Sequence, residues 1–244
     1  RIDPFSVDSM DTYASVIRIR GAVSSLNALA QELLESAPRE PESWAAYALY
    51  ADSMGRKERA LAVVERSLLL YPAHVFTHLL HGALLLGSGR PLPALSAFTE
   101  AHSMSKDLSA FQGMIQCYIS LGDVSKAVAV GREAAATMPK SARALALYGL
   151  ALTYDDGSRA VARQVLERAV RMRPSCAEAV LSLADLDVLD SNHAAALARL
   201  RAYDETETLS GEFICTKIAE VHDLSGKPEE ALAAYRVALG MNPS

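Results

Sequence analysis

Three histidines stand at a spacing that would place their side chains on one face of a helix. His74, His78 and His81 are separated by four and three residues, and such intervals bring side chains together. Three imidazoles so arranged could in principle bind zinc, although structural zinc normally takes four ligands. The repeat pattern described below places His78 and His81 where large rings fill a core. We therefore predict packed, hydrogen-bonded histidines and no metal site.

Charged residues gather in two further segments. The first is basic and contains Arg159, Arg163, Arg168, Arg171 and Arg173. The second is acidic and contains Asp185, Asp187 and Asp190. Charge runs on helices usually face solvent, so we predict a solvated surface for both segments, with a phosphate or acidic-partner site as the alternative for the arginines. The aspartates lack the loop pattern of a calcium site.

Patterns typical of catalysis and cofactor binding are weak. Gly87-Ser88-Gly89 lacks the preceding strand and the following Lys-Ser/Thr of a phosphate loop and is predicted to be a turn. Cys117, Cys176 and Cys215 fit neither a zinc motif nor a disulfide framework, and buried thiols are expected. We predict that the protein is not an enzyme and uses no cofactor.

Composition limits the classes of partner. Half of the 244 residues are apolar, the formal net charge is −5 and the pI is about 5.7. A general nucleic-acid binder needs a concentrated basic footprint, so nucleic acid is not expected as a partner. The longest apolar run, 144–152, is far shorter than the roughly 20 residues that span a bilayer, and no membrane partner is expected.

The stretch 44–72 indicates that pairs of helices, arranged as repeats, must position any functional site. A tetratricopeptide (TPR) repeat has large residues on its first helix, a turn glycine, small residues on its second helix and a terminal proline. The matching residues here are Trp44, Tyr47, Ala48, Gly55, Ala60, Val64 and Pro72. The small residues allow two helices to cross closely, and the proline ends the second helix.

The same pattern recurs along the chain. Repeats are predicted to start near residues 7, 41, 75, 108, 142, 177 and 212. We therefore predict an all-α, right-handed superhelix (α-solenoid) of about seven tetratricopeptide repeats, forming a single array over 1–244, with 1–6 as the end of a preceding repeat. Repeat five has one extra residue in its turn. Repeat six has no turn glycine and no terminal proline, so its second helix is expected to be the least regular.

The position of each residue within its repeat, which we call the repeat phase, predicts a protein-binding groove lined by the first helix of each repeat. Its residues are predicted to be Leu49, Phe76, Leu79, Leu86, Gln112, Gln116, Ile119, Asp185 and Glu220. The apolar members could accept a partner helix or an extended segment, and inward crowding by tight winding is the alternative. Ala45 is also placed on the groove, so Ala45→Ser is expected to cost little. The Lys and Asn set with which chaperone-binding TPR proteins clamp a carboxylate is missing.

Several blocks resemble a particular TPR family. These are 2–5 and 10–13 near the start, then 111–118, 122–127 and 162–174. They are similar to the TPR scaffold subunits of the anaphase-promoting complex, a ubiquitin ligase of eukaryotic cell division, and closest to the family of its seventh subunit. This chain is richer in alanine and carries Pro91 and Pro93 where ordinary helix formers are expected.

The resemblance implies a non-catalytic scaffold of the nucleus and cytoplasm, acting in mitosis and cell-cycle control. Its partners would be other TPR subunits, and the full-length protein would form a homodimer through N-terminal repeats. The opening 1–4 resembles the end of a repeat, so the chain is expected to be a C-terminal superhelix fragment and a monomer. The alternatives are a peptide-binding TPR adaptor of another pathway and a regulatory domain excised from an enzyme.

Overall fold

The protein is helical throughout the part that the structure describes. The computed structural model describes residues 7–204 and 211–241, in which all regular structure is α-helix apart from one 3₁₀ turn. The chain packs as two compact units that divide between Leu121 and Gly122. The predicted all-α TPR solenoid is confirmed. The preceding-repeat residues 1–6 and the segment 205–210 lie outside the described residues.

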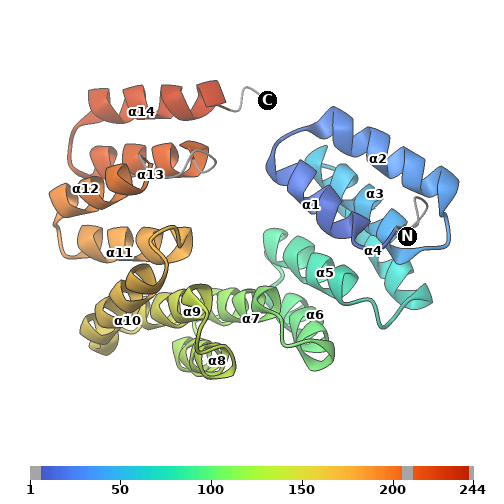
Figure 1. Ribbon diagram of the computed structural model, residues 1–244, viewed down its shortest axis with the longest axis horizontal. Coiled ribbons are helices and arrows are strands. Elements are labelled where there is room, and N and C mark those ends of the chain that lie inside the picture. The colour runs from blue at the N-terminus through green and yellow to red at the C-terminus, as the bar shows by residue number, and fades with distance from the viewer. Residues whose placement is uncertain (1–6, 205–210, 242–244) are drawn as a thin grey trace. The chain divides into compact units, whose positions relative to one another are not determined.

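The described part of the first unit, residues 7–121, contains seven helices. They are α1 (Met10–Ile19), α2 (Val23–Ser36), α3 (Pro41–Ser53), α4 (Lys57–Leu70), α5 (Val75–Gly87), α6 (Pro91–Met104) and α7 (Leu108–Ser120). Successive helices fold back on each other as antiparallel neighbours, as α5 and α6 show (Figure 1). The first helices also pack side by side, because α3 contacts both α1 and α5, and α5 contacts α7.

The second unit continues the alternation over its described residues. Its elements are α8 (Val124–Thr137), α9 (Ala142–Thr153), η1 (Asp156–Ser158), α10 (Arg159–Met172), α11 (Ala177–Leu189), α12 (His193–Asp204), α13 (Gly211–Leu224) and α14 (Pro228–Met241). The short 3₁₀ helix η1 accommodates the extra residue of the predicted fifth turn. The hairpin of α13 and α14 shows the pairing clearly (Figure 1).

Among the described hairpins, every turn except the one that contains η1 has one residue with left-handed backbone geometry. Gly55, between α3 and α4, has φ 72°, a conformation that glycine adopts without a steric penalty. Where repeat six lacks the glycine, Ser191 takes the same conformation at φ 58°. Its turn therefore keeps the geometry of the other turns at a local conformational cost.

Small residues allow the helices of each unit to approach closely. Ala48, Ala60, Ala94 and Ala127 are fully buried, as the repeat phase predicts. Between α5, α6 and α7 the packing is tighter still, because Phe98 lies against Gly82 and Gly113. A Cβ atom on Gly82 would lie 2.8 Å from the Phe98 ring, and one on Gly113 would lie closer. The glycines are therefore required by the aromatic ring.

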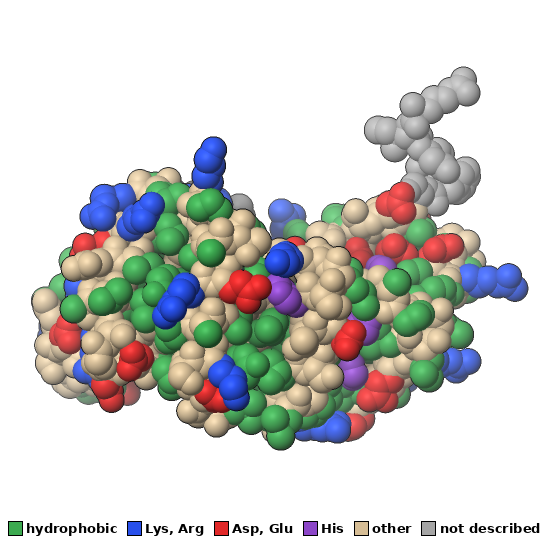
Figure 2. All heavy atoms as spheres, turned by 90° about the horizontal axis from the view of Figure 1, so that it is seen from below, with side chains coloured by type: hydrophobic (Ala, Val, Ile, Leu, Met, Phe, Trp, Pro, Cys, Tyr) green, Lys and Arg blue, Asp and Glu red, His purple; other side chains and the backbone are tan. Residues whose placement is uncertain are grey.

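Surface side chains are mixed in character. Figure 2 shows a face on which charged residues lie singly or in small groups among hydrophobic ones. None of the described helices has the length and apolar character needed to cross a membrane.

We expect Ala127→Leu to lower the free energy of unfolding of the second unit by about 1–3 kcal/mol through overpacking. Ala127 is fully buried on α8, whereas Ala136 on the same helix is exposed. Ala136→Leu should therefore change stability by less than about 0.5 kcal/mol. Urea unfolding followed by circular dichroism compares the two variants. Equal losses would contradict the assigned packing face.

Candidate protein-binding grooves

The first unit contains a groove of about 470 Å³. Its apolar floor is formed by Leu49, Leu80 and Phe98, which are buried, and by Phe76 and Leu79, which are partly exposed. The rim is polar and consists mainly of Thr12, Ser15, Arg18, Asp107, Ser109, Gln112 and Gln116. All of these except Phe98 and Asp107 come from first helices of the hairpins. The arrangement suits a chain segment with apolar side chains and a backbone that can bond to the rim.

The structure brings five of the predicted groove residues together here: Leu49, Phe76, Leu79, Gln112 and Gln116. Leu86 and Ile119 are partly buried but do not line this groove. Leu49 is only 1% exposed, so it supports the floor and offers little surface to a partner.

The predicted groove position of Ala45 is wrong. Its side chain is 1% exposed, because α3 is packed between α2 and the neighbouring first helices. A serine hydroxyl at this position would be buried and would need a hydrogen-bond partner. Ala45→Ser therefore does not test the groove.

A polar cluster connects α1 and α3 to His74, the residue that precedes α5. The His74 Nε2 atom lies 3.4 Å from Asp11 Oδ2 and 3.8 Å from Glu42 Oε1. Burial raises the pKa of Asp11, but hydrogen bonds from His74 and from the Thr12 N–H outweigh burial and leave this pKa below its ordinary value. Asp11 is thus held ionised although it is nearly inaccessible.

The second unit contains a groove of about 550 Å³ between α9, α11 and α13. Leu150, Val188, Leu189, Val221 and Leu224 form its apolar surface. The two predicted residues of this unit, Asp185 and Glu220, also line it. The structure therefore places all the predicted residues except Leu86 and Ile119 along one of two grooves.

Lys217 connects these two acidic residues and was not predicted. Its Nζ atom lies 2.7 Å from Asp185 Oδ1 and 2.9 Å from Glu220 Oε2. Burial lowers the pKa of Lys217, but the hydrogen bonds to both carboxylates more than compensate and raise it above its ordinary value. The groove thus carries a fixed ion-pair bridge across α11 and α13.

The three histidines have separate environments. His74 Nδ1 lies 2.6 Å from Thr77 Oγ1, and His78 Nε2 lies 2.8 Å from the carbonyl oxygen of Pro72. His81 Nε2 lies 3.8 Å from Glu65 Oε1, which is within ion-pair distance but too long for the predicted hydrogen bond, and no other described group bonds to it. Burial lowers the pKa of His81, and the nearby Glu65 offsets this only in part. In residues 7–204 and 211–241, no group of three or more His, Cys, Asp or Glu side chains is arranged to hold a metal ion.

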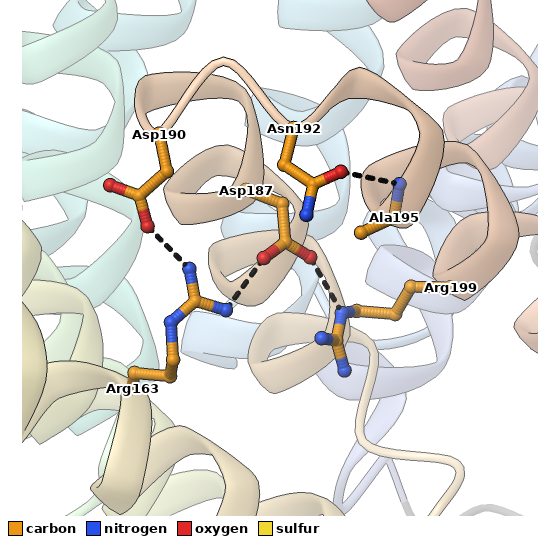
Figure 3. A network of polar contacts seen from close by, with 6 residues as sticks. All are labelled: Arg163, Asp187, Asp190, Asn192, Ala195 and Arg199. Atoms are coloured by element: carbon orange, nitrogen blue, oxygen red, sulfur yellow. Dashed lines mark hydrogen bonds and ion pairs between the residues drawn. The ribbon is translucent and has the colours of Figure 1, made fainter.

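A buried carboxylate connects α10, α11 and α12 (Figure 3). Asp187 accepts hydrogen bonds from Arg163 Nη1 at 2.6 Å and from Arg199 Nε at 3.2 Å. Arg163 Nη2 also donates to Asp190 Oδ2 at 2.7 Å. The hydrogen bond to Asp187, partly opposed by burial and aided by Asp190, raises the pKa of Arg163.

The predicted solvated surface is therefore wrong for Asp187, which is 3% exposed, and for Arg163, which is ion-paired. The eleventh residue of a repeat is buried at Ile17, Ala51, Leu85, Leu152 and His222 and partly buried at Tyr118. Asp187 occupies that position in repeat six. The position of Asp187 within its repeat therefore predicts that its side chain is buried.

Cys117 is expected to resist thiol reagents in the folded protein. It is fully buried, and burial raises its pKa to about 11 from an ordinary 9.0. The folded state thus favours the neutral thiol, so this contribution to stability is complete below pH 9 and is lost as the pH rises from 9.0 toward 11. Labelling followed by mass spectrometry should detect modified Cys117 in urea but not in native protein at pH 8. Rapid native labelling would contradict its burial.

Two-helix repeats of about 34 residues, joined by tight turns and crossing at small residues, define a tetratricopeptide repeat solenoid. A family model described as "Tetratricopeptide repeat" matches residues 152–208. The crystal structure of the APC/C hetero-tetramer Cut9-Hcn1 shares the fold, with a TM-score of 0.71 and 16% identity over 100% of this chain and 48% of that chain.

The sequence relatives are more specific. Anaphase-promoting complex subunit 7 of Arabidopsis thaliana is 30% identical over 242 residues, which cover 99% of this chain and 43% of the relative. The subunit 7 of Dictyostelium discoideum is 29% identical over 245 residues, covering 99% of this chain and 41% of the relative. The chain thus has a TPR fold and is similar along its length to subunit 7 of the anaphase-promoting complex, and it spans about two fifths of these curated relatives.

Proposed function

We propose that the chain is a non-catalytic protein-interaction scaffold, acting as a TPR subunit of an anaphase-promoting-complex ubiquitin ligase in cell division. The observation that carries this proposal is the similarity to subunit 7 over 99% of the chain. Because the chain spans 43% of that relative, the partners and activity of the whole protein are part of the proposal.

The grooves support a role in binding proteins. Each combines an apolar surface with a polar rim on rigid helices, which suits a helix or extended segment of a partner. We propose other TPR subunits as partners, with neither nucleic acid nor membrane among them, and a location in nucleus and cytoplasm. The proposal also includes homodimerisation of the full-length protein through N-terminal repeats, with this chain alone as a monomer.

Affinity purification of the full-length protein, followed by mass spectrometry, tests the proposal. Subunits of the ubiquitin ligase are the expected partners, whereas an unrelated set of partners would overturn the proposal in favour of an adaptor of another pathway.

Binding of partners in the groove of the first unit is tested with Thr12→Arg and Gln116→Arg, which change exposed rim residues and should lower the recovery of partners. Glu100→Arg, on exposed α6 surface away from this groove, is the matched control and should leave the recovered partners unchanged.

A further inference from the structure

A basic pocket in the second unit lies apart from both grooves. It has a volume of about 510 Å³ and is formed where the α8–α9 connection meets the end of α10 and the start of α11. Its lining includes three cationic residues, Lys140, Arg143 and Arg173, and one acidic residue, Glu178. Formal charges alone therefore leave two excess positive charges around one cavity.

The ion pairs within the pocket show which of its charged residues have no ion-pair partner. Arg143 Nε lies 2.7 Å from Glu178 Oε1, so these two charges neutralise each other. Lys140 and Arg173 have no carboxylate within ion-pair distance in the part of the chain that the structure describes; Arg173 Nε donates only to Ser175 Oγ, at 3.1 Å. Two cations thus face a shared cavity without a counter-charge.

Two hydroxyl groups add neutral donors to this cavity. Ser141 Oγ accepts a hydrogen bond from the Ala144 N–H at 3.2 Å, and Ser175 Oγ accepts one from Arg173. A serine hydroxyl has one proton to donate besides the bonds that it accepts. Both protons are therefore available to a ligand that brings acceptors. The same pocket opens onto α11, whose N-cap residue Cys176 makes no side-chain cap.

We propose that this pocket binds a phosphate group. Guanidinium and ammonium groups form their strongest hydrogen bonds with anionic oxygens, and phosphate supplies several acceptor oxygens and close to two negative charges at neutral pH. A single carboxylate would neutralise only one of the two unpaired cations. The phosphate can arrive free or as a phosphorylated side chain of a protein, and both share the chemistry that the pocket recognises.

Titration calorimetry with inorganic phosphate tests the pocket, with chloride at equal ionic strength as the control for screening. We expect saturable phosphate binding, weakened at least about tenfold by Lys140→Ala or Arg173→Ala, because each removes a charge-assisted hydrogen bond. Arg171→Ala is the matched control on α10. Its side chain is 71% exposed, lies near Glu167 and does not line the pocket, so binding should be unchanged.

A short phosphoserine peptide and its unphosphorylated form distinguish the sources. Tighter binding of the phosphopeptide than of free phosphate identifies a phosphorylated protein, whereas equal binding identifies the free anion. Absence of phosphate binding to the parent protein would overturn the proposal. So would equal losses for Arg171→Ala and Arg173→Ala, since these would indicate non-specific attraction. The pocket does not depend on the scaffold role, because this measurement uses no ligase subunit.

Discussion

Replacing Asp187 with alanine is expected to lower the free energy of unfolding of the second unit by about 2–4 kcal/mol. The carboxylate is almost inaccessible and accepts hydrogen bonds from Arg163 and Arg199. Its removal leaves two guanidinium groups without their shared partner. Both arginine side chains are about 30% exposed, so water compensates part of the loss and a larger effect is not expected.

Asp190→Ala is the matched control for this experiment. Asp190 binds the same guanidinium group, but its side chain is 52% exposed, and an exposed ion pair contributes at most about 1 kcal/mol. Urea unfolding of both variants and the parent gives the comparison. If Asp187→Ala were no more destabilising than Asp190→Ala, the buried carboxylate would not stabilise the packing of α10, α11 and α12.

Gly113→Ala is expected to destabilise the first unit by about 1–3 kcal/mol. Alanine is the better helix former by about 1 kcal/mol, so intrinsic propensity predicts the opposite sign. A Cβ atom at this position would overlap the ring of Phe98, whose side chain is itself buried. Steric overlap therefore outweighs helix propensity. Thermal or urea unfolding measures the resulting change in the free energy of unfolding.

Gly87→Ala provides the control, because a Cβ atom there would meet nothing within 4 Å. This variant should be neutral or more stable by up to about 1 kcal/mol. Adding Phe98→Leu to Gly113→Ala should recover part of the loss, since the smaller side chain makes room for the new methyl group. Additive losses in the double variant would contradict a direct clash between the two positions.

Repeat phase made most of the fold predictable. A residue such as Ala94 or Ala127 is small for one reason, the close crossing of two helices, and that reason recurs at a fixed interval. The turn at Gly55 is similarly local, because a left-handed backbone favours glycine. The same reasoning located most of the candidate groove residues, since first helices present equivalent positions to one side of each unit.

Ion pairs across repeats were not predictable in the same way. Lys217 could have faced solvent, and only the packing of α13 beside α11 shows that it lies between Asp185 and Glu220. Asp187 is buried although it lies in a run of charged residues, because Arg163 and Arg199 both donate hydrogen bonds to its carboxylate. Ser191 shows a different case, in which the backbone keeps its geometry although the favoured residue is absent.

Among the described helices of each unit, the substantial contacts join helices that are at most two apart in order. Such contacts close short loops, and proteins rich in them fold quickly. Cooperativity then depends on the coupling between adjacent hairpins more than on a shared centre. A destabilising change in one hairpin therefore weakens mainly the repeats next to it in the sequence. One end of a unit can then unfold while the remaining repeats stay folded.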